Sequence, residues 1–354
     1  MWREGPPPGW SELLRDDPNA TPAHLPELWE ALAGVLPGHA VRFAAVEEGG
    51  ELVGGAAALV ERRAGLHWIH GLPMVLPGTP LARAGRHEDV DRAVASAYEW
   101  LRRELGAAGG EWSLYRPRGP AVVAAALEIP AGETRTLDSA VVDLTGGVPA
   151  AWRRVDRKTR QDIQRARERG LWFGEDPERC DEAWGLHAAQ ARGRRGPAPL
   201  PLELSRRLIA RGVARLFAVG DAGGLLSATL ALDHPRETLV WWSGTHPAGR
   251  GTHAFPLLLW SVIEWAAGAG RERVNLGASP GLDPVAAFKR SLGAPRARAA
   301  AARPALSAIT RSARVSTKRA RARWSGSRRA VIRRSEPHAA TTRGRRPARV
   351  ASTP

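Results

Sequence analysis

The chain has 354 residues, 43% of them hydrophobic, and a formal net charge of +16 at pH 7. This length is sufficient for two hydrophobic cores, and no run of about 18 apolar residues predicts a membrane-spanning helix. The start, MWREGPPPGW, lacks the pattern of a secretory signal, and the single cysteine, Cys180, excludes an internal disulfide and a CxxC metal site. We therefore expect a cytoplasmic protein.

In the first half, hydrophobic spacing predicts helices, and apolar/polar alternation predicts strands. Residues 1 to 25 are rich in Pro and Gly, which favours an irregular lead-in. The predicted elements that follow are a helix over 25–36, a hairpin of strands 41–46 and 52–60 around Gly49-Gly50, a helix over 89–105 ended by Gly106, and a strand over 111–115.

The second half opens near Ser139 with the strand-like sequence Ala-Val-Val-Asp-Leu. One long helix is expected from Trp152 to Arg169, ended by Gly170. Beyond it we predict helices over 178–191 and 202–211, strands over 215–219, 225–233 and 238–243, a helix that follows Thr252, a strand over 274–276, and a last helix from Asp283 to Gly293.

The two halves repeat one pattern. Phe43 with Gly49-Gly50 recurs as Phe217 with Gly223-Gly224, 174 residues later, and Ser-x-x-Glu-Trp follows each hairpin at Ser96 and Ser261. A repeated order of hairpin, helix and strand indicates a duplicated unit. The sequence thus predicts a mixed α/β sheet built from two tandem units, residues 1–138 and 139–295.

Residues 296–354 have a different composition. They hold 17 Lys and Arg against one acidic residue, Glu336, whereas residues 1–295 are balanced at 35 basic and 35 acidic residues. A segment rich in Ala and Arg buries too little apolar surface to fold, so a disordered tail is predicted. Such a tail either only adds solubility or contacts nucleic acid or an anionic membrane surface.

A glycine-containing turn precedes the apolar helix of the second unit. Gly249 and Gly251 permit close backbone approach, Thr252 is a suitable N-cap, and Pro256 fits the first turn. Free amides at a helix start bind phosphate, and Arg250 adds a charged hydrogen bond. Taken alone, the pattern also fits a plain tight turn.

The end of the second unit carries a strand, Val274-Asn275-Leu276, followed by Gly277-Ala278-Ser279 and by the helix that begins at Asp283. This helix carries Phe288 and Lys289. Lys289 is one of three lysines in a chain with 49 arginines, so an ammonium at this position suggests a role. A solvated helix charge is the alternative.

The order strand, glycine turn, helix, Asn-Leu-Gly-Ala-Ser and Phe-Lys-Arg-Ser-Leu-Gly-Ala resembles the closing half of the FemAB family and of CelD-type acyltransferases, within the GNAT superfamily. The Arg-rich segment over 156–170 is similar to the helix that opens the second unit of those proteins. The resemblance covers residues 140–294 well and residues 25–136 by pattern only. It implies tandem GNAT units and transfer of an acyl group, acetyl or aminoacyl, onto an amine.

The resemblance implies two rival donors. GNAT enzymes that use acyl-CoA bind it at a Gln/Arg-x-x-Gly-x-Gly/Ala turn, which implies that Gly249, Arg250, Gly251 and Thr252 bind the cofactor; here His246 replaces the first position. FemAB enzymes use aminoacyl-tRNA, need no cofactor, and modify a peptidoglycan precursor. For them the Phe-Lys pair implies that Phe288 and Lys289 assist transfer, with Lys289 neutralising charge near the reacting ester or phosphate.

Candidates for the remaining roles are less specific. Asp283, His246 and His253 are possible general bases. Arg157, Lys158 and Arg160 lie in a stretch of eight basic and three acidic residues over 152–169, which suits a phosphate-rich substrate or tRNA, or else is a solvated face. His67 and His70 are three apart on a predicted strand, so they point to opposite faces and cannot share a metal unless the chain turns there. A non-catalytic GNAT-fold binding protein, anchored by its basic tail, is the alternative to an enzyme.

Overall fold

The structure, a computed structural model, describes residues 2–71, 76, 80–114, 132–193, 199–279 and 282–304. All of these belong to the first of two compact units, residues 1–305. The predicted tail beyond residue 304 lies outside the described residues, as does Tyr115 of the predicted strand over 111–115.

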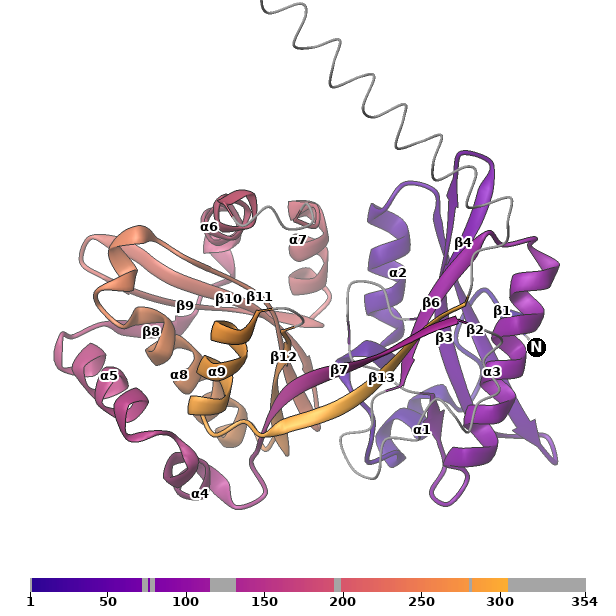
Figure 1. Ribbon diagram of the computed structural model, residues 1–354, viewed down its shortest axis with the longest axis horizontal. Helices are drawn as coiled ribbons and strands as arrows, with labels where there is room; N and C mark the ends of the chain where they lie inside the picture. The colour runs from indigo at the N-terminus through magenta and orange to yellow at the C-terminus, as the bar shows by residue number, and fades with distance from the viewer. Residues whose placement is uncertain are drawn as a thin grey trace, which may run out of the picture. The chain divides into compact units, whose positions relative to one another are not determined.

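The described residues of the first half form a small mixed sheet with three α-helices (Figure 1). Its hairpin turn contains Gly49 and Gly50 with φ of 59° and 85°, the positive values that a two-residue turn between twisted strands requires. The elements are β1 (Trp2–Arg3), α1 (Trp10–Asp16), α2 (Pro26–Val35), β2 (His39–Glu48), β3 (Glu51–Arg63), β4 (Leu66–His70), β5 (Leu81–Ala82), α3 (His87–Glu104) and β6 (Gly109–Leu114), with a 3-10 turn, η1 (Pro22–His24).

The second half begins with two additional helices, α4 (Gly147–Arg154) and α5 (Arg157–Glu168), and then follows the same order. Its further elements are β8 (Trp172–Glu175), η4 (Pro177–Arg179), α6 (Cys180–Gly193), α7 (Leu202–Ala210), β9 (Ala214–Asp221), β10 (Gly224–His234), β11 (Glu237–Thr245), η5 (Pro247–Arg250), α8 (Ala254–Gly268), β12 (Arg273–Ala278) and α9 (Asp283–Ser291).

The predicted duplication is confirmed by the topology. In each half a strand and two helices precede three antiparallel strands, and a helix then leads to a strand that pairs in parallel with the third of them, β4 with β6 and β11 with β12. With β7 (Gly132–Asp143) and β13 (Arg296–Pro304) included, the strand order is β1-β2-β3-β4-β6-β13-β7-β12-β11-β10-β9-β8, and β5 pairs with β3. The two halves thus repeat one α/β fold.

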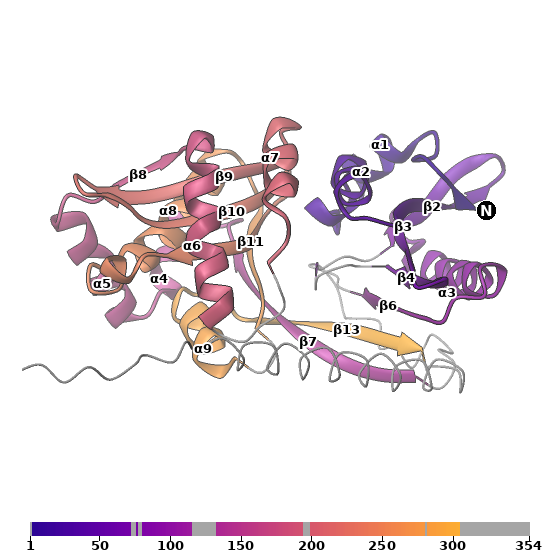
Figure 2. The ribbon, with the colours of Figure 1, turned by 90° about the horizontal axis from the view of Figure 1, so that it is seen from above.

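Two long strands join the halves. β7 (Gly132–Asp143) pairs with β12, and β13 (Arg296–Pro304) pairs with both β7 and β6. Figures 1 and 2 show β7 and β13 running side by side. The last strand of the second half therefore completes the sheet of the first, and the boundary expected at residues 138 and 139 falls within β7.

Three predicted elements need correction. The lead-in over residues 1–25 is not irregular, because α1 forms there and buries Trp10 and Leu13. The helix expected from Trp152 to Arg169 is broken at Val155 and Asp156, because Val155 is extended and the Asp156 N–H donates to Ser291 O in α9. Residues 296–304, predicted as part of the disordered tail, form β13, because pairing with β6 and β7 supplies backbone bonds that their Ala/Arg composition could not predict.

Helices cover both faces of the second sheet. In Figure 2, α6 crosses one face of β9, β10 and β11, and the apolar core on this side also contains α7, α1 and α2. On the opposite face α8 packs with α4 and α5. α8 buries most of its side chains, as expected for a helix that is apolar all round.

Gly244 lets α6 lie directly on β11. A Cβ at Gly244 would be 2.5 Å from His187 N, whereas one at Gly174, also in a strand, would meet nothing within 4 Å. We expect Gly244→Ala to lower the free energy of unfolding by about 1–3 kcal/mol, because backbone on both sides must shift. Gly174→Ala should change it by less than about 0.5 kcal/mol. Equal values for the two variants in chemical denaturation would contradict this packing.

Candidate functional site

The site is built where two parallel strands separate. β11 and β12 pair from Glu237↔Arg273 to Leu239↔Asn275, but β11 continues to Thr245 without β12 beside it. On its other side β12 shifts register with β7 between Asn275 and Ala278, which is a β-bulge. Gly277 lies in this bulge with φ of 76°, a value that favours glycine. The bulge therefore turns peptide groups out of the sheet ladder.

Lys289 of α9 binds those peptide groups. Its Nζ donates to Gly277 O at 3.0 Å and to Ala278 O at 3.3 Å. The side chain is half-buried, and burial lowers its pKa to about 8. Among the described residues no carboxylate pairs with it. An ammonium has three N–H groups, so this arrangement leaves one for a ligand.

Two neighbours of Lys289 complete the arrangement. The Phe288 ring stacks on Phe255 at the start of α8, with centroids 5.4 Å apart, so the two helices are in contact here. Ser279 Oγ, just beyond the carbonyls that hold Lys289, is buried and has no hydrogen-bond partner among the described residues. A buried hydroxyl without a partner is costly unless a ligand supplies one. Together Phe288, Lys289 and Ser279 form a small site with two available donors.

Asp283 does not belong to this group. It is the first residue of α9, is exposed, and lies six positions before Lys289, more than one and a half helical turns away. The structure therefore gives no support for Asp283 as a base beside Lys289. Its acidic side chain instead suits the positive start of the helix.

The glycine-containing turn before α8 uses some of its amide groups in hydrogen bonds within the turn. His246 O accepts from Gly249 N at 2.9 Å, and His246 Nδ1 accepts from Ala248 N at 3.2 Å. Thr252 is not the N-cap: its hydroxyl donates to Gly249 O, and His253, with φ of 60°, precedes the first helical residue. The cap prediction is wrong by one residue, because the turn continues through His253 before α8 begins.

Asp162 of α5 and Arg169, the residue that follows α5, contact the chain just before α8. Arg169 Nη1 donates to Gly251 O at 2.6 Å, and His253 Nδ1 lies 3.6 Å from Asp162 Oδ1. A carboxylate next to a helix start opposes the binding of a second anion there. Arg250 and Thr252 remain near the expected phosphate position, but two of the turn's amides are already occupied.

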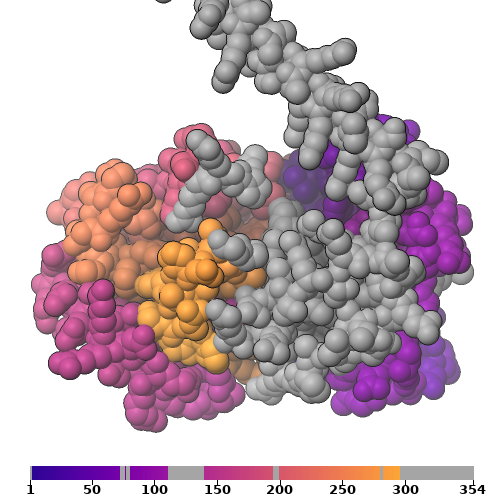
Figure 3. All heavy atoms as spheres, in the orientation of Figure 1, coloured from indigo at the N-terminus to yellow at the C-terminus, as the bar shows by residue number. Residues whose placement is uncertain are grey.

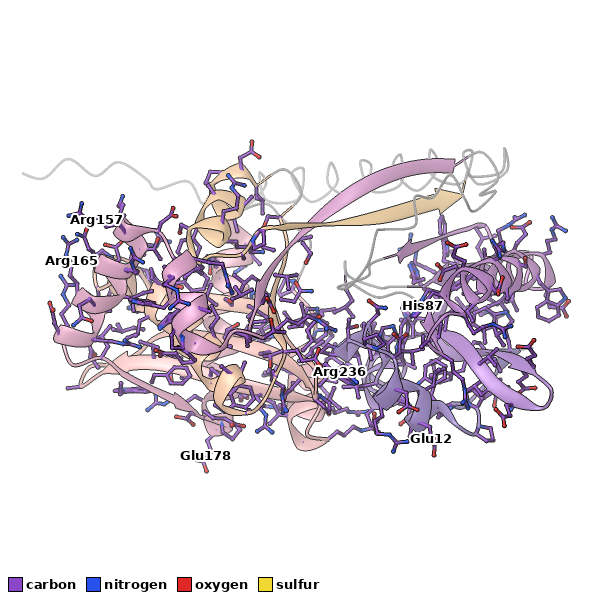
Figure 4. The ribbon with its side chains drawn as sticks, turned by 90° about the horizontal axis from the view of Figure 1, so that it is seen from below. Glu12, His87, Arg157, Arg165, Glu178 and Arg236 are labelled. Carbon is purple, nitrogen blue, oxygen red and sulfur yellow. The ribbon has the colours of Figure 1, made fainter. Side chains whose placement is uncertain are left out.

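The basic residues predicted to bind substrate lie at the start of α5. Arg157 and Lys158 are exposed, and neither has an ion-pair partner among the described residues. Arg160 is half-buried and turns back towards Trp152 O, at 3.5 Å. Figure 4 shows Arg157 and Arg165 projecting outward from α5. The break between α4 and α5 thus exposes Arg157 and Lys158 together.

These basic residues adjoin α9. The Asp156 N–H donates to Ser291 O at 2.8 Å, and Thr159 Oγ1 donates to Ser291 Oγ at 2.7 Å. Figure 3 shows α9 beside α4 and α5 on one face. Arg290 of α9 is also exposed. The fold therefore brings the predicted substrate-binding residues to the helix that carries Lys289.

Sequence reasoning missed three contributors to this region. Arg169 is one of 49 arginines, so its residue type gave no signal, and Ser279 entered the sequence analysis only as the end of Asn-Leu-Gly-Ala-Ser, without a role of its own. Asn275 lies between two apolar residues of a buried strand, and this polar residue at an expected core position was the one available signal. Within the described residues, no three His, Cys, Asp or Glu side chains gather into a metal site. Nor does any helix in those ranges combine the length and apolar character needed to cross a membrane.

Comparison with known proteins agrees with this fold. The sequence profile of the acetyltransferase (GNAT) domain matches residues 153–290. The crystal structure of FemX superposes with a TM-score of 0.62 and 11% identity, over 85% of this chain and 96% of that one. No curated protein matches in sequence.

Two further solved structures share the fold. The C-terminal domain of a putative lysylphosphatidylglycerol synthetase from Agrobacterium fabrum has a TM-score of 0.53 and 13% identity, over 87% of this chain and 96% of that one. L-PGS from Bacillus licheniformis has a TM-score of 0.52 and 13% identity, over 90% and 97%. The chain thus shares the fold of these structures, and its residues 153–290 match the GNAT acetyltransferase domain.

Proposed function

We propose that this GNAT-fold acyltransferase moves an aminoacyl group from aminoacyl-tRNA onto an amine acceptor at the site that contains Lys289. The amine nitrogen attacks the ester carbonyl carbon, a C–N bond forms, and the C–O bond to the tRNA breaks. The proton lost by nitrogen ends on the leaving oxygen. Negative charge develops on oxygen during this step, and a fixed ammonium stabilises it.

The observation that carries the proposal is the placement of Lys289. Two main-chain carbonyls fix its ammonium where β11 and β12 separate, and one N–H remains available. Ser279 Oγ offers a second hydrogen bond to substrate. A fixed, half-buried charge interacts more strongly with a developing oxyanion than a solvated one does. Phe288 contributes by holding α9 against α8.

The choice of donor follows from the start of α8. Asp162 near His253, and the bonds of His246 to the amides of Ala248 and Gly249, disfavour the pyrophosphate of acyl-CoA. Exposed Arg157 and Lys158 suit a polyphosphate backbone such as tRNA. FemX and the putative lysylphosphatidylglycerol synthetase share the tandem fold, which is compatible with this donor. An amine of a cell-wall precursor is the acceptor we propose.

The glycines favour a second candidate. Gly249 is buried, with no room for a Cβ, which would lie 2.6 Å from Leu226 O, and Gly251 follows it as in CoA-binding turns. Thermal denaturation with CoA and with charged tRNA separates the candidates, because only the true donor stabilises the folded chain. A shift with CoA alone would overturn the tRNA proposal. A shift with neither would favour a non-catalytic protein.

The basic start of α5 provides a separate test of tRNA binding. We expect Arg157→Glu with Lys158→Glu to weaken binding about tenfold or more and to reduce the salt-dependence slope by about 2, because two phosphate contacts are lost. Arg62→Glu with Arg192→Glu makes the same charge change at exposed positions on other elements. If both pairs weaken binding equally in filter-binding titrations across salt concentrations, α5 is not the docking surface.

A further inference from the structure

Asn275 occupies the centre of the bulge that carries the Lys289 acceptors. Its side chain is fully buried, and Oδ1 accepts from Gly277 N at 2.8 Å and from Ser139 Oγ at 2.7 Å. Its Nδ2 donates to Glu237 Oε1 at 3.1 Å. Two donors on one side and a carboxylate on the other leave one orientation for the amide.

The side-chain amide of Asn275 takes the place of a backbone hydrogen bond between β12 and β7. Where β12 shifts register against β7, the N–H of Gly277 turns to Oδ1 of Asn275 and its carbonyl turns to Lys289. Gly277 is therefore held on both sides: its N–H donates to Asn275, and its C=O accepts from Lys289. A bulge held at one residue fixes the directions of its peptide groups.

The far end of the network is also fixed. Glu237 has no exposed surface, and its Oε2 accepts from Arg273 Nε at 2.6 Å. Arg273 in turn donates to Pro18 O at 3.2 Å and to Ala20 O at 2.7 Å, both in the first half of the chain. The chain of contacts therefore runs from the first half through Glu237 and Asn275 to Gly277.

We propose that Asn275 is a positioning residue for Lys289, which acts through the Gly277 and Ala278 carbonyls and is held in place by Glu237 and Ser139. The inference rests on the proposed role of Lys289 in transfer. Asn275 itself does not touch substrate. Its contribution is to hold the carbonyls so that the ammonium points into the space between β11 and β12.

Lysine labelling tests this inference without any substrate. The chain has only Lys158, Lys289 and Lys318, so trace labelling with acetic anhydride across a pH series, followed by mass spectrometry, reports each amine separately. In the native chain we expect Lys289 to be half-reactive near its pKa of about 8. Lys158, which is exposed, is the internal reference.

Asn275→Ala is expected to release Lys289 into solvent, because Gly277 loses the acceptor for its N–H and the bulge relaxes. The half-reactive pH of Lys289 should then rise by about one unit or more towards the ordinary value of a lysine. Once the donor is established, kcat should fall about tenfold or more with KM nearly unchanged. An unchanged labelling profile in the folded variant would overturn the inference.

Asn275→Asp is the conservative variant. The introduced carboxyl, facing Glu237, is protonated at neutral pH and then accepts and donates as the amide does. We expect native labelling of Lys289 near neutrality and the Asn275→Ala behaviour at alkaline pH, where that carboxyl ionises. Asn275→Ala behaviour at every pH would contradict the inference.

Ser139→Ala removes a single bond to Oδ1 and is the variant to use if Asn275→Ala does not fold. It should raise the half-reactive pH of Lys289 by less than Asn275→Ala does. An unchanged half-reactive pH would count against the hydrogen-bond network around Asn275. If these variants shift the half-reactive pH of Lys289 but the native chain transfers no aminoacyl group, the positioning role holds and the proposed function is wrong.

Discussion

Lys289→Met is expected to lower the rate of transfer about a hundredfold or more and, at the same time, to stabilise the fold. Removal of one fixed donor to a developing oxyanion typically costs about 10²–10³ in rate. Burial lowers the pKa of Lys289 from 10.5 to about 8, so charging this amine in the folded chain is unfavourable. After allowance for its partial exposure, the variant should gain about 1–2 kcal/mol in free energy of unfolding. Single-turnover transfer and urea denaturation measure the two effects.

The gain in stability expected for Lys289→Met should depend on pH. Because the pKa of Lys289 is lower in the folded chain than in the unfolded one, the penalty is fully present below pH 8 and disappears as the pH rises towards 10.5. The stability difference between Lys289→Met and the native chain should therefore vanish at alkaline pH. Transfer by the native chain should decline as the pH rises through about 8, because the ammonium is lost.

Lys289→Arg is the matched control. Its guanidinium stays charged at every accessible pH, so this variant should keep part of the rate and lose the decline above pH 8. If Lys289→Met transferred at the native rate, or if Lys289→Arg showed the native pH profile, the ammonium would not be the group that acts.

Arg273→Met is expected to have the largest effect on stability, a loss of about 3–5 kcal/mol in free energy of unfolding. Glu237 is fully buried, and its pairing with Arg273 opposes the rise in pKa that burial causes. Without Arg273 a buried carboxylate has no compensating charge, which is the costly case. The bonds to Pro18 O and Ala20 O are lost as well.

The predicted loss depends on pH and on the partner. In Arg273→Met the pKa of Glu237 rises further above its unfolded value, so the variant becomes less stable as the pH rises above the ordinary range of a carboxyl. Adding Glu237→Gln keeps a side-chain oxygen for Asn275 and removes the charge, so the double variant should recover most of the stability. A loss below about 1 kcal/mol in Arg273→Met, measured by denaturation at neutral pH, would contradict this.

The duplicated fold could be predicted from the sequence because its signals are local. Phe43 and Phe217 occupy equivalent strands, and the Gly-Gly pairs lie at equivalent hairpins. The strand before Gly277 and the helix with Phe288 and Lys289 were equally visible, since periodicity and glycine mark them.

Features that depend on distant contacts could not be predicted. The helix break at Asp156 is set by Ser291, 135 positions later, whereas the local sequence of α4 and α5 reads as one helix. β13 forms from Ala and Arg because β6 and β7 offer unpaired edges. The Asn275 network joins residues that no spacing rule connects.

Transfer from a labelled aminoacyl-tRNA mixture to an amine-bearing cell-wall precursor tests the central claim most directly. With the native chain we predict single-turnover loss of label from tRNA and its appearance as an amide on the precursor, at a rate reduced about a hundredfold or more in Lys289→Met. Acyl-CoA in place of charged tRNA should give no product. Native product from acyl-CoA and none from charged tRNA, or equal rates for the native chain and Lys289→Met, would contradict the account.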